Sequence, residues 1–258
     1  MNVLQNLVEL YNQLPQGSTY RIVVKGILDH LSEAADATIY DLAEMTDSSR
    51  TTIWRMLQKM GYENYSDFRH ALKKEVGQYT YYNRILQADE DTDLDDILSR
   101  AITQTKNIRS TMEKHFHTKD ISAIADIVYE KQEILFYFPY HCYSINSFQQ
   151  NLAMAGKSTG YFCLYPDMLE SNRHADKDTL IFIDTIDYAE TMDMQEIFRT
   201  AKESGAAIFK MTPTRRHYKN YIDRTLFNFD MGKDISSNLT LTTMYFLLLS
   251  EIFRKKYL

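Results

Sequence analysis

Residues 38–62 read TIYDLAEMTDSSRTTIWRMLQKMGY, and this stretch decides the fold of the first part of the chain. A polar turn, Thr46-Asp47-Ser48-Ser49, consists of residue types that bond to nearby backbone and begin helices. Apolar residues recur at helical spacing on both sides of it, at Ile39, Leu42, Ala43, Ile53, Leu57 and Met60. We therefore predict two short amphipathic helices joined by a tight turn, with Gly61 ending the second helix.

The second predicted helix has the surface chemistry of a helix that reads DNA. No acidic residue occurs between Ser48 and Met60, whereas several side chains there are basic. A short helix that presents hydroxyl groups and cations after a capped turn suits the major groove of DNA. We expect DNA contacts from Thr38, Ser48, Ser49, Arg50, Thr51, Thr52, Arg55 and Lys59.

The positions of these residues predict different roles for them. Ser49 is expected to cap the second helix or to contact phosphate. Residues 50–52 lie in the first turn, where base edges and backbone are within reach. Arg55 and Lys59 are better placed for phosphate, with guanine readout and an ion pair with Asp67 as the alternatives for Arg55.

Length and composition describe a folded chain of one large or two ordinary domains. The chain has 258 residues, of which 44% are hydrophobic, and only 8 glycines and 4 prolines. Its two cysteines are too few for a disulfide framework, so we expect them to be reduced and buried. The net charge of −6 argues against non-specific coating of nucleic acid but permits a local basic face.

The chain shows no membrane or export signal. Its first residues carry acid and lack a basic segment, which argues against a signal peptide. The longest strongly apolar run near the end, residues 244–249, is too short to span a bilayer. The predicted location is the cytoplasm, with no membrane partner.

Helical periodicity extends on both sides of the opening stretch. It predicts helices over residues 3–11, 22–31 and about 66–76, so that residues 1–78 form one helix-turn-helix domain. Trp54 is expected to be partly buried because it lies between Ile53 and Leu57. The segment 88–96, which holds six acidic residues, is interpreted as a solvated hinge and the charged start of the next helix, within a helical linker over 79–105.

The second part of the chain alternates strands with helices. We predict helices at 94–115, 120–129, 149–155, 194–203 and 239–253, and strands at 134–138, 161–164, 180–183, 207–211 and 225–227. Continuously apolar strands between helices indicate a parallel sheet that is covered on both faces. The predicted fold class is therefore α plus α/β, with the α/β domain over residues 106–258.

This arrangement resembles the RpiR family of bacterial transcription regulators over nearly the whole chain. The most specific motifs are Ser49-x-x-Thr52-Ile53-x-Arg55, Met60-Gly61-Tyr62 and Tyr65-Ser66-Asp67-Phe68. The resemblance implies a homodimer or a dimer of dimers that binds a double-stranded DNA operator and has no enzymatic activity. It also implies that the second domain is a sugar isomerase (SIS) domain, a doubly wound sheet that binds phosphosugars.

The two loops that hold phosphate in SIS domains are not preserved in this chain. The first, roughly Gly-x-Gly-x-Ser, is replaced by the segment 137–141, YFPYH, which lacks both glycines. The second, roughly Ser-x-Ser-Gly-x-Thr, is replaced by the carboxylate-containing segment 184–191. We interpret this domain as a dimerisation scaffold or as a sensor for a sugar phosphate or other small anion. Its expected ligand contacts are His141, Ser144, Thr185, Thr191, Thr212 and Arg215.

Two other classes of function stay open. A phosphosugar isomerase-like enzyme with a helical appendage would need the missing loops. A protein-interaction module without DNA binding is compatible with the eight basic and nine acidic residues between Thr19 and Val76. The segment 156–158 lacks the upstream glycine of a P-loop, and the histidines match no common zinc spacing. We therefore predict no catalytic residue, no metal and no cofactor.

Overall fold

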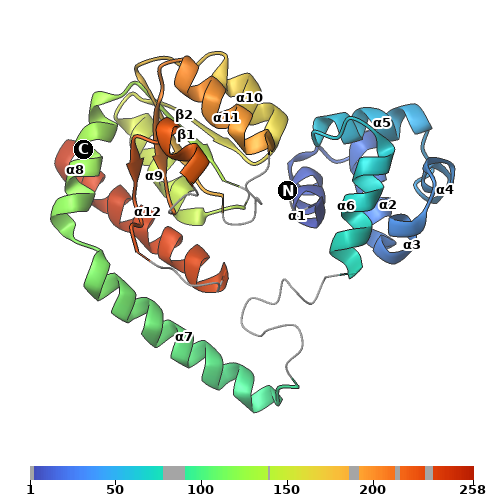
Figure 1. Cartoon of the computed structure of the whole chain (residues 1–258), viewed down its shortest axis with the longest axis horizontal. Coiled ribbons are helices and arrows are strands. Elements are labelled where there is room, and N and C mark those ends of the chain that lie inside the picture. The colour runs from blue at the N-terminus through green and yellow to red at the C-terminus, as the bar shows by residue number, and fades with distance from the viewer. Residues whose placement is uncertain (1–2, 78–90, 139, 186–191, 213–215, 230–234) are drawn as a thin grey trace.

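The computed structural model describes residues 3–77, 91–138, 140–185, 192–212, 216–229 and 235–258, which form a helical domain and an α/β domain (Figure 1). The helical domain contains α1 (Val3–Gln13), α2 (Thr19–Asp29), α3 (Leu31–Asp36), α4 (Ile39–Met45), α5 (Arg50–Lys59) and α6 (Tyr65–Gly77). Its core combines apolar side chains from all six helices. The predicted fold class, α plus α/β, is confirmed.

One predicted helix of this domain is in fact two. The sequence indicated a single helix over residues 22–31, but α2 ends at Asp29 and α3 begins at Leu31. His30 between them leaves the helical region, with φ of −133°, and its N–H donates to the Ile27 carbonyl in a tightened last turn. The short α3 then turns Ala34 and Ala35 into the core.

The α/β domain is a five-stranded, all-parallel sheet with helices on both faces. Its strands are β1 (Glu133–Tyr137), β2 (Ser158–Phe162), β3 (Thr179–Ile183), β4 (Ala207–Lys210) and β5 (Arg224–Thr225), in the order β2-β1-β3-β4-β5. The helices are α7 (Leu94–His115), α8 (Thr118–Glu130), α9 (Tyr143–Met154), α10 (Tyr165–Asn172), α11 (Met192–Glu203), α12 (Ile235–Tyr257) and the 3-10 helix η2 (Arg216–Tyr221). This is a doubly wound sheet, whose strand order reverses direction between β1 and β3.

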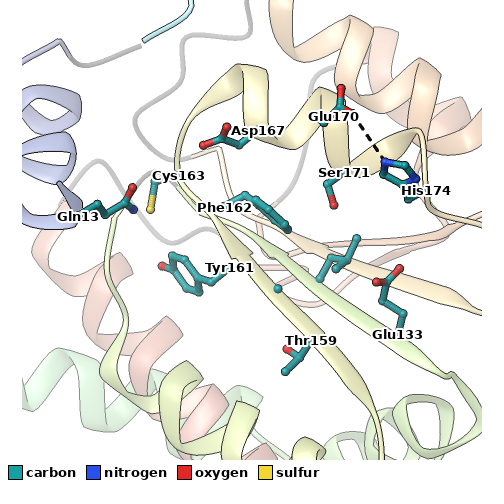
Figure 2. Close-up of a pocket in the computed structure, with 12 residues that line it drawn as sticks. Gln13, Glu133, Thr159, Tyr161, Phe162, Cys163, Asp167, Glu170, Ser171 and His174 are labelled. Atoms are coloured by element: carbon teal, nitrogen blue, oxygen red, sulfur yellow. Dashed lines mark ion pairs between the residues drawn. The ribbon is translucent and has the colours of Figure 1, made fainter. Parts of the chain in front are cut away.

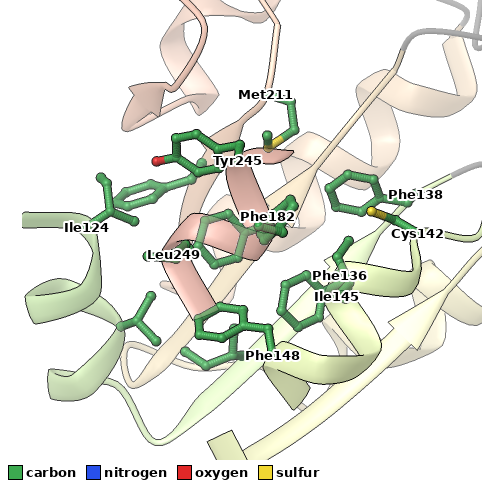
Figure 3. Packing of buried hydrophobic residues seen from close by; sticks show 14 of the residues in the cluster. Ile124, Phe136, Phe138, Cys142, Ile145, Phe148, Phe182, Met211, Tyr245 and Leu249 are labelled. Carbon is green, nitrogen blue, oxygen red and sulfur yellow. The ribbon is translucent and has the colours of Figure 1, made fainter. Parts of the chain in front are cut away.

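Alternating strand residues point to two separate cores. Ile134 and Phe136 of β1 pack with Phe182 of β3 against α8, α9 and α12, where many aromatic rings meet (Figure 3). Leu135 and Ile181, which point the other way, pack against α10 and α11. Because both faces are covered, the central strands read as continuous apolar runs in the sequence.

Several predicted elements shift. The strand expected at 161–164 is β2, which starts three residues earlier, because Cys163 and Leu164 already turn the chain into α10. The last strand is the short β5, and neither α10 nor η2 was predicted. Helix α7 has the predicted bounds and runs through the predicted linker boundary at residue 105. The division into 1–78, 79–105 and 106–258 stays a prediction.

The two domains touch each other at the start of α10. Leu164 is buried among the apolar residues of the helical domain. Pro166 approaches Gly61, where an added Cβ would lie 3.4 Å from the proline ring. Separately, none of the helices that the structure describes is long and apolar enough to cross a membrane.

Candidate nucleic-acid interface

The turn between α4 and α5 is built by short polar residues and a close helix contact. The Thr46 hydroxyl donates to the Leu42 carbonyl at 2.7 Å and closes α4, and Asp47 then takes the left-handed region with φ of 45°. Asp tolerates that conformation better than most residues. Gly26 of α2 passes so close that an added Cβ would lie 2.8 Å from Thr46 Cγ2. The turn is therefore held in place by α2.

Ser49 caps α5, as the sequence predicted. Its hydroxyl accepts a hydrogen bond from the Thr52 N–H at 3.1 Å and lies 2.9 Å from the Thr52 hydroxyl. Gly61 follows the other end of α5 in the left-handed region, with φ of 86°, which confirms its expected role in ending the helix. Thr51, in the first turn of α5 just after this cap, is exposed.

The inner face of α5 consists of Ile53, Met56 and Leu57, which are fully buried. Trp54 is 42% exposed, so more than half of its surface is covered, as expected of a partly buried side chain. Helical geometry turns it about 100° away from Ile53, to the edge of the buried stripe. The outer face therefore carries a large aromatic side chain in addition to its polar groups.

The outer face of α5 carries the basic side chains. Thr51, Arg55 and Lys59 are exposed and follow each other at intervals of four residues, so they lie along one line of the helix. The guanidinium of Arg50 lies 4.4 Å from the centre of the Tyr40 ring, a cation–π contact to an exposed residue of α4. This contact already restricts the Arg50 side chain, so that less side-chain entropy is lost when Arg50 binds a ligand.

A hollow of 260 Å³ lies between the start of α2 and the outer face of α5. It is lined by Ser18, Thr19, Tyr20, Thr52 and Arg55. Ser18 is the N-cap of α2, and its side chain makes no capping hydrogen bond. The N–H groups at a helix start, the helix dipole and a guanidinium together favour an anion. Sequence reasoning missed this site, although the break at residues 15–18 before a helix start was its signal.

Thr38 and Ser48 were also expected to contact DNA, but the side chain of Thr38 caps a helix and the hydroxyl of Ser48 is buried. Thr38 forms a capping box with Asp41 at the start of α4, where the backbone N–H and hydroxyl of Thr38 lower the pKa of the Asp41 carboxyl. The Ser48 hydroxyl is buried and has no hydrogen-bond partner within the described part of the chain. Asp67 accepts from Asn64, and no ion pair joins it to Arg55 among the described residues.

Two buried side chains meet at the carboxyl ends of the central strands of the α/β domain. Tyr140, which follows β1, donates a hydrogen bond to Asp184, which follows β3, and both are buried. Burial and the neighbouring carboxylate raise the pKa of Tyr140 far above its usual value. The crevice at the switch point of the sheet, where doubly wound folds bind ligands, is thus occupied by the chain's own side chains.

The predicted ligand residues that the structure describes have partners or surroundings of their own. Ser144 is buried against Cys142, with 3.1 Å between the hydroxyl and the thiol, and Thr185 is also buried. Thr212 accepts hydrogen bonds of 2.9 Å from the buried Lys210 ammonium at both its carbonyl and its hydroxyl. Thr191 and Arg215 lie outside the described residues.

His141 faces the helical domain instead of the sheet crevice. Its Nε2 lies 2.6 Å from Oε1 of Glu9, a carboxylate of α1 whose side chain is only 9% exposed. The Gln13 amide donates to the same oxygen at 2.6 Å. His141, which follows β1, is therefore in direct contact with the helical domain.

A larger groove of 630 Å³ runs along the edge strand β2 and α10 (Figure 2). It is lined by carboxylates, including Glu133, Asp167 and Glu170, and Glu170 lies 3.7 Å from His174. It contains none of the predicted ligand residues, and its acidic lining disfavours a phosphate. Among the described residues, no cluster of potential metal ligands occurs.

A two-domain architecture with an exposed basic recognition helix defines a DNA-binding regulator. The family model of the rpiR-family helix-turn-helix domain matches residues 1–79. The N-terminal domain of this chain therefore belongs to the rpiR family, as its motifs predicted. None of the curated proteins matches the chain.

Two solved structures are similar to the chain. The Vibrio vulnificus NanR protein complexed with ManNAc-6P is 20% identical with a TM-score of 0.47, and the match covers 99% of this chain and 91% of that one. A putative sugar-phosphate isomerase from Listeria monocytogenes strain 4b F2365 is 10% identical with a TM-score of 0.44, over 64% and 90%. Because both scores are below 0.5, the fold assignment relies on the sheet order and the two cores described above.

Proposed function

We propose that this protein is a dimeric, sequence-specific DNA-binding transcription regulator and not an enzyme. The observation that carries the proposal is the outer face of α5, where Thr51, Arg55 and Lys59 are exposed on a segment without acidic residues. The family of the N-terminal domain supports it. We also keep the cytoplasm as the proposed location and residues 1–78 as the DNA-binding unit.

In this proposal α5 enters the major groove with its first turn toward the bases. Arg50, Thr51 and Thr52 reach base edges, while Lys59 contacts the backbone. Arg55 and the N–H groups of Thr19 and Tyr20 in the first turn of α2 hold one phosphate in the hollow between α2 and α5, because that hollow combines a cation with a helix start. Two chains place two such helices in successive major grooves, about 34–36 Å apart along the DNA.

The α/β domain serves as a dimerisation scaffold in this proposal. An isomerase needs an open crevice with a catalytic group at the strand ends, whereas Tyr140 and Asp184 close that crevice by bonding to each other. A second role, control by a sugar phosphate or another small anion, is favoured by the contact between His141 and Glu9. An anion that draws His141 away would loosen the helical domain.

DNA recognition is tested by selection of bound duplexes from a random pool by the full-length protein. We expect enriched sites with two inverted half-sites whose centres lie about 10 base pairs, or a multiple, apart. Arg50→Ala is expected to relax the selected sequence, whereas the control Arg254→Ala in the last turn of α12 should not change it. Recovery of unselected sequence by the wild type would contradict sequence-specific binding.

Control by an anion is tested by a thermal-shift screen with sugar phosphates and inorganic phosphate. A compound that raises the melting temperature and changes DNA affinity supports an effector role, and His141→Ala should uncouple the two effects. If no compound shifts the melting temperature while DNA binding is intact, the effector role is wrong and the scaffold role stands.

A further inference from the structure

The first half of helix α7 projects from the α/β domain and carries exposed apolar side chains (Figure 1). None of the 22 residues of α7 is buried. Only its second half is anchored, where Ile108 and Met112 pack on the core and His115 stacks on Phe229 at 4.2 Å. The first half extends beyond the domain, and a free helical end of this length is marginally stable in water.

The first half of α7 carries a continuous apolar stripe, made of Leu94, Ile97, Leu98, Ala101 and Ile102. Their spacing is that of one face of an amphipathic helix. Leu94 is 79% exposed, Leu98 66% and Ile102 47%. Single exposed apolar residues are ordinary, but three that line up on one helix face, beside the half-buried Ile97 and Ala101, mark an interaction surface.

The charges along α7 indicate what covers this stripe. The acidic residues Asp91, Asp93, Asp95 and Asp96 lie at its start, where no basic residue occurs before Arg100. The segment from Arg100 to Lys114 carries four basic residues and only one acidic residue, Glu113. Two α7 helices therefore attract each other when they run antiparallel and repel each other when they run parallel.

We propose that the apolar stripe of α7 is covered by the same stripe of a second copy of this chain, in an antiparallel pair. A two-fold axis makes each copy contribute the same surface. With the axis at Leu98, which is the middle of the stripe, Leu98 meets Leu98 of the second copy. Leu94 then faces Ile102, and Asp96 faces Arg100.

This inference specifies the contact behind the dimer in the proposed function, and it does not depend on DNA. Five side chains from each copy cover less than the roughly 1,200–2,000 Å² of a standard interface. The α7 pair is therefore one part of the dimer contact, and disrupting it weakens the dimer without unfolding either domain.

Cysteine cross-linking of the full-length protein tests the geometry. Under mild oxidation Leu98→Cys should give a disulfide-linked dimer, because this position lies on the axis. Leu94→Cys alone and Ile102→Cys alone should not form a linked dimer. In the antiparallel pair, each of these positions lies eight residues, or about 12 Å along the helix, from the same position in the second copy. A mixture of these two variants should cross-link. Wild type, with two buried cysteines, and Thr103→Cys are the controls.

Several results would overturn the inference. If Leu98→Cys gives no linked dimer, the stripe is covered by another segment or partner. If Leu94→Cys and Ile102→Cys each link to themselves, the helices run parallel.

Sedimentation provides an independent readout. Leu98→Arg should raise the dimer dissociation constant at least tenfold, with an unchanged circular dichroism spectrum and retained salt-dependent binding of random DNA. An unchanged dissociation constant would contradict the α7 pair while leaving the regulator intact, whereas a wild type that is monomeric on its operator would remove the dimeric part of the proposed function itself.

Discussion

Tyr140 donates a hydrogen bond to Asp184 across the carboxyl ends of β1 and β3, the neighbouring strands between which a doubly wound sheet usually opens to its ligand. Both side chains are buried. The backbone carbonyl of Tyr140 also accepts a hydrogen bond from Tyr161, so the segment after β1 is bonded on two sides. The hydrogen bond between Tyr140 and Asp184 thus fills, with buried side chains, the place where such a sheet usually has a ligand crevice.

Removing that hydrogen bond should destabilise the α/β domain. Tyr140→Phe leaves a buried carboxylate with one donor fewer, and we expect a loss of about 1–3 kcal/mol in the free energy of unfolding. Urea denaturation followed by circular dichroism measures it. The control Tyr143→Phe alters a residue that is 82% exposed and should change stability little. Equal stabilities of the two variants would show that the Tyr140 bond contributes nothing.

Ser49 allows its capping role to be separated from DNA binding. Ser49→Ala removes the acceptor for the Thr52 N–H and should cost about 1 kcal/mol of stability. Ser49→Asp keeps an acceptor and a favourable charge at the helix start, so its stability should match the wild type. It should nevertheless weaken DNA binding, because a carboxylate there repels phosphate. Wild-type DNA affinity in Ser49→Asp would place this helix start away from the DNA.

The two cysteines should be unreactive in the native protein. Cys142 and Cys163 are buried and free, and burial raises the pKa of the Cys163 thiol. Since the thiolate is the reactive form, we expect a colorimetric thiol reagent to label neither at pH 8, and both after unfolding in guanidinium chloride. Rapid labelling of Cys163 in the native state would mean that the contact between β2, α10 and the helical domain opens in solution.

Asp126 should contribute to stability in a pH-dependent way. Lys256 and Tyr257 of α12 donate hydrogen bonds to it, and they hold the pKa of its carboxyl below the usual value. A depressed pKa in the folded state stabilises the protein above the unfolded pKa of about 3.9, and the contribution is lost as the pH falls through the folded value.

The test of this pH dependence compares Asp126→Asn with the wild type by urea denaturation between pH 3 and 7. The difference in stability should be largest at neutral pH and should shrink toward pH 3. Glu130→Gln, a change at an exposed position of the same helix, is the control. A difference that is constant over this range would exclude a depressed pKa in the folded state.

Local patterns in the sequence predicted the elements that have strong local signals. The bounds of α7 and the cap of α5 came out as expected, because helical periodicity and N-cap chemistry act within a few residues. Helix α10 was missed because Pro166 reads as a breaker, although proline is well tolerated in the first turn of a helix.

The site was less predictable because its parts come from distant segments. The hollow joins Ser18 to Arg55, and the closed crevice joins Tyr140 to Asp184. The sequence indicated that the phosphate loops are altered, but not that tyrosine and aspartate fill the space between them. Such pairs depend on the register of the sheet and on helix packing, which spacing along the chain does not report.

The central claim is that the outer face of α5 and the start of α2 bind the DNA backbone and bases. The most direct measurement is a fluorescence-anisotropy titration of duplex DNA at several salt concentrations, with wild type, Arg55→Ala and the control Arg173→Ala at the C-cap of α10. We predict that the affinity of the wild type falls steeply with salt, and that Arg55→Ala weakens binding and lowers the slope of log K against log salt by about one phosphate contact. Arg173→Ala should match the wild type. No binding by the wild type even at low salt, or an unchanged slope in Arg55→Ala, would contradict the account.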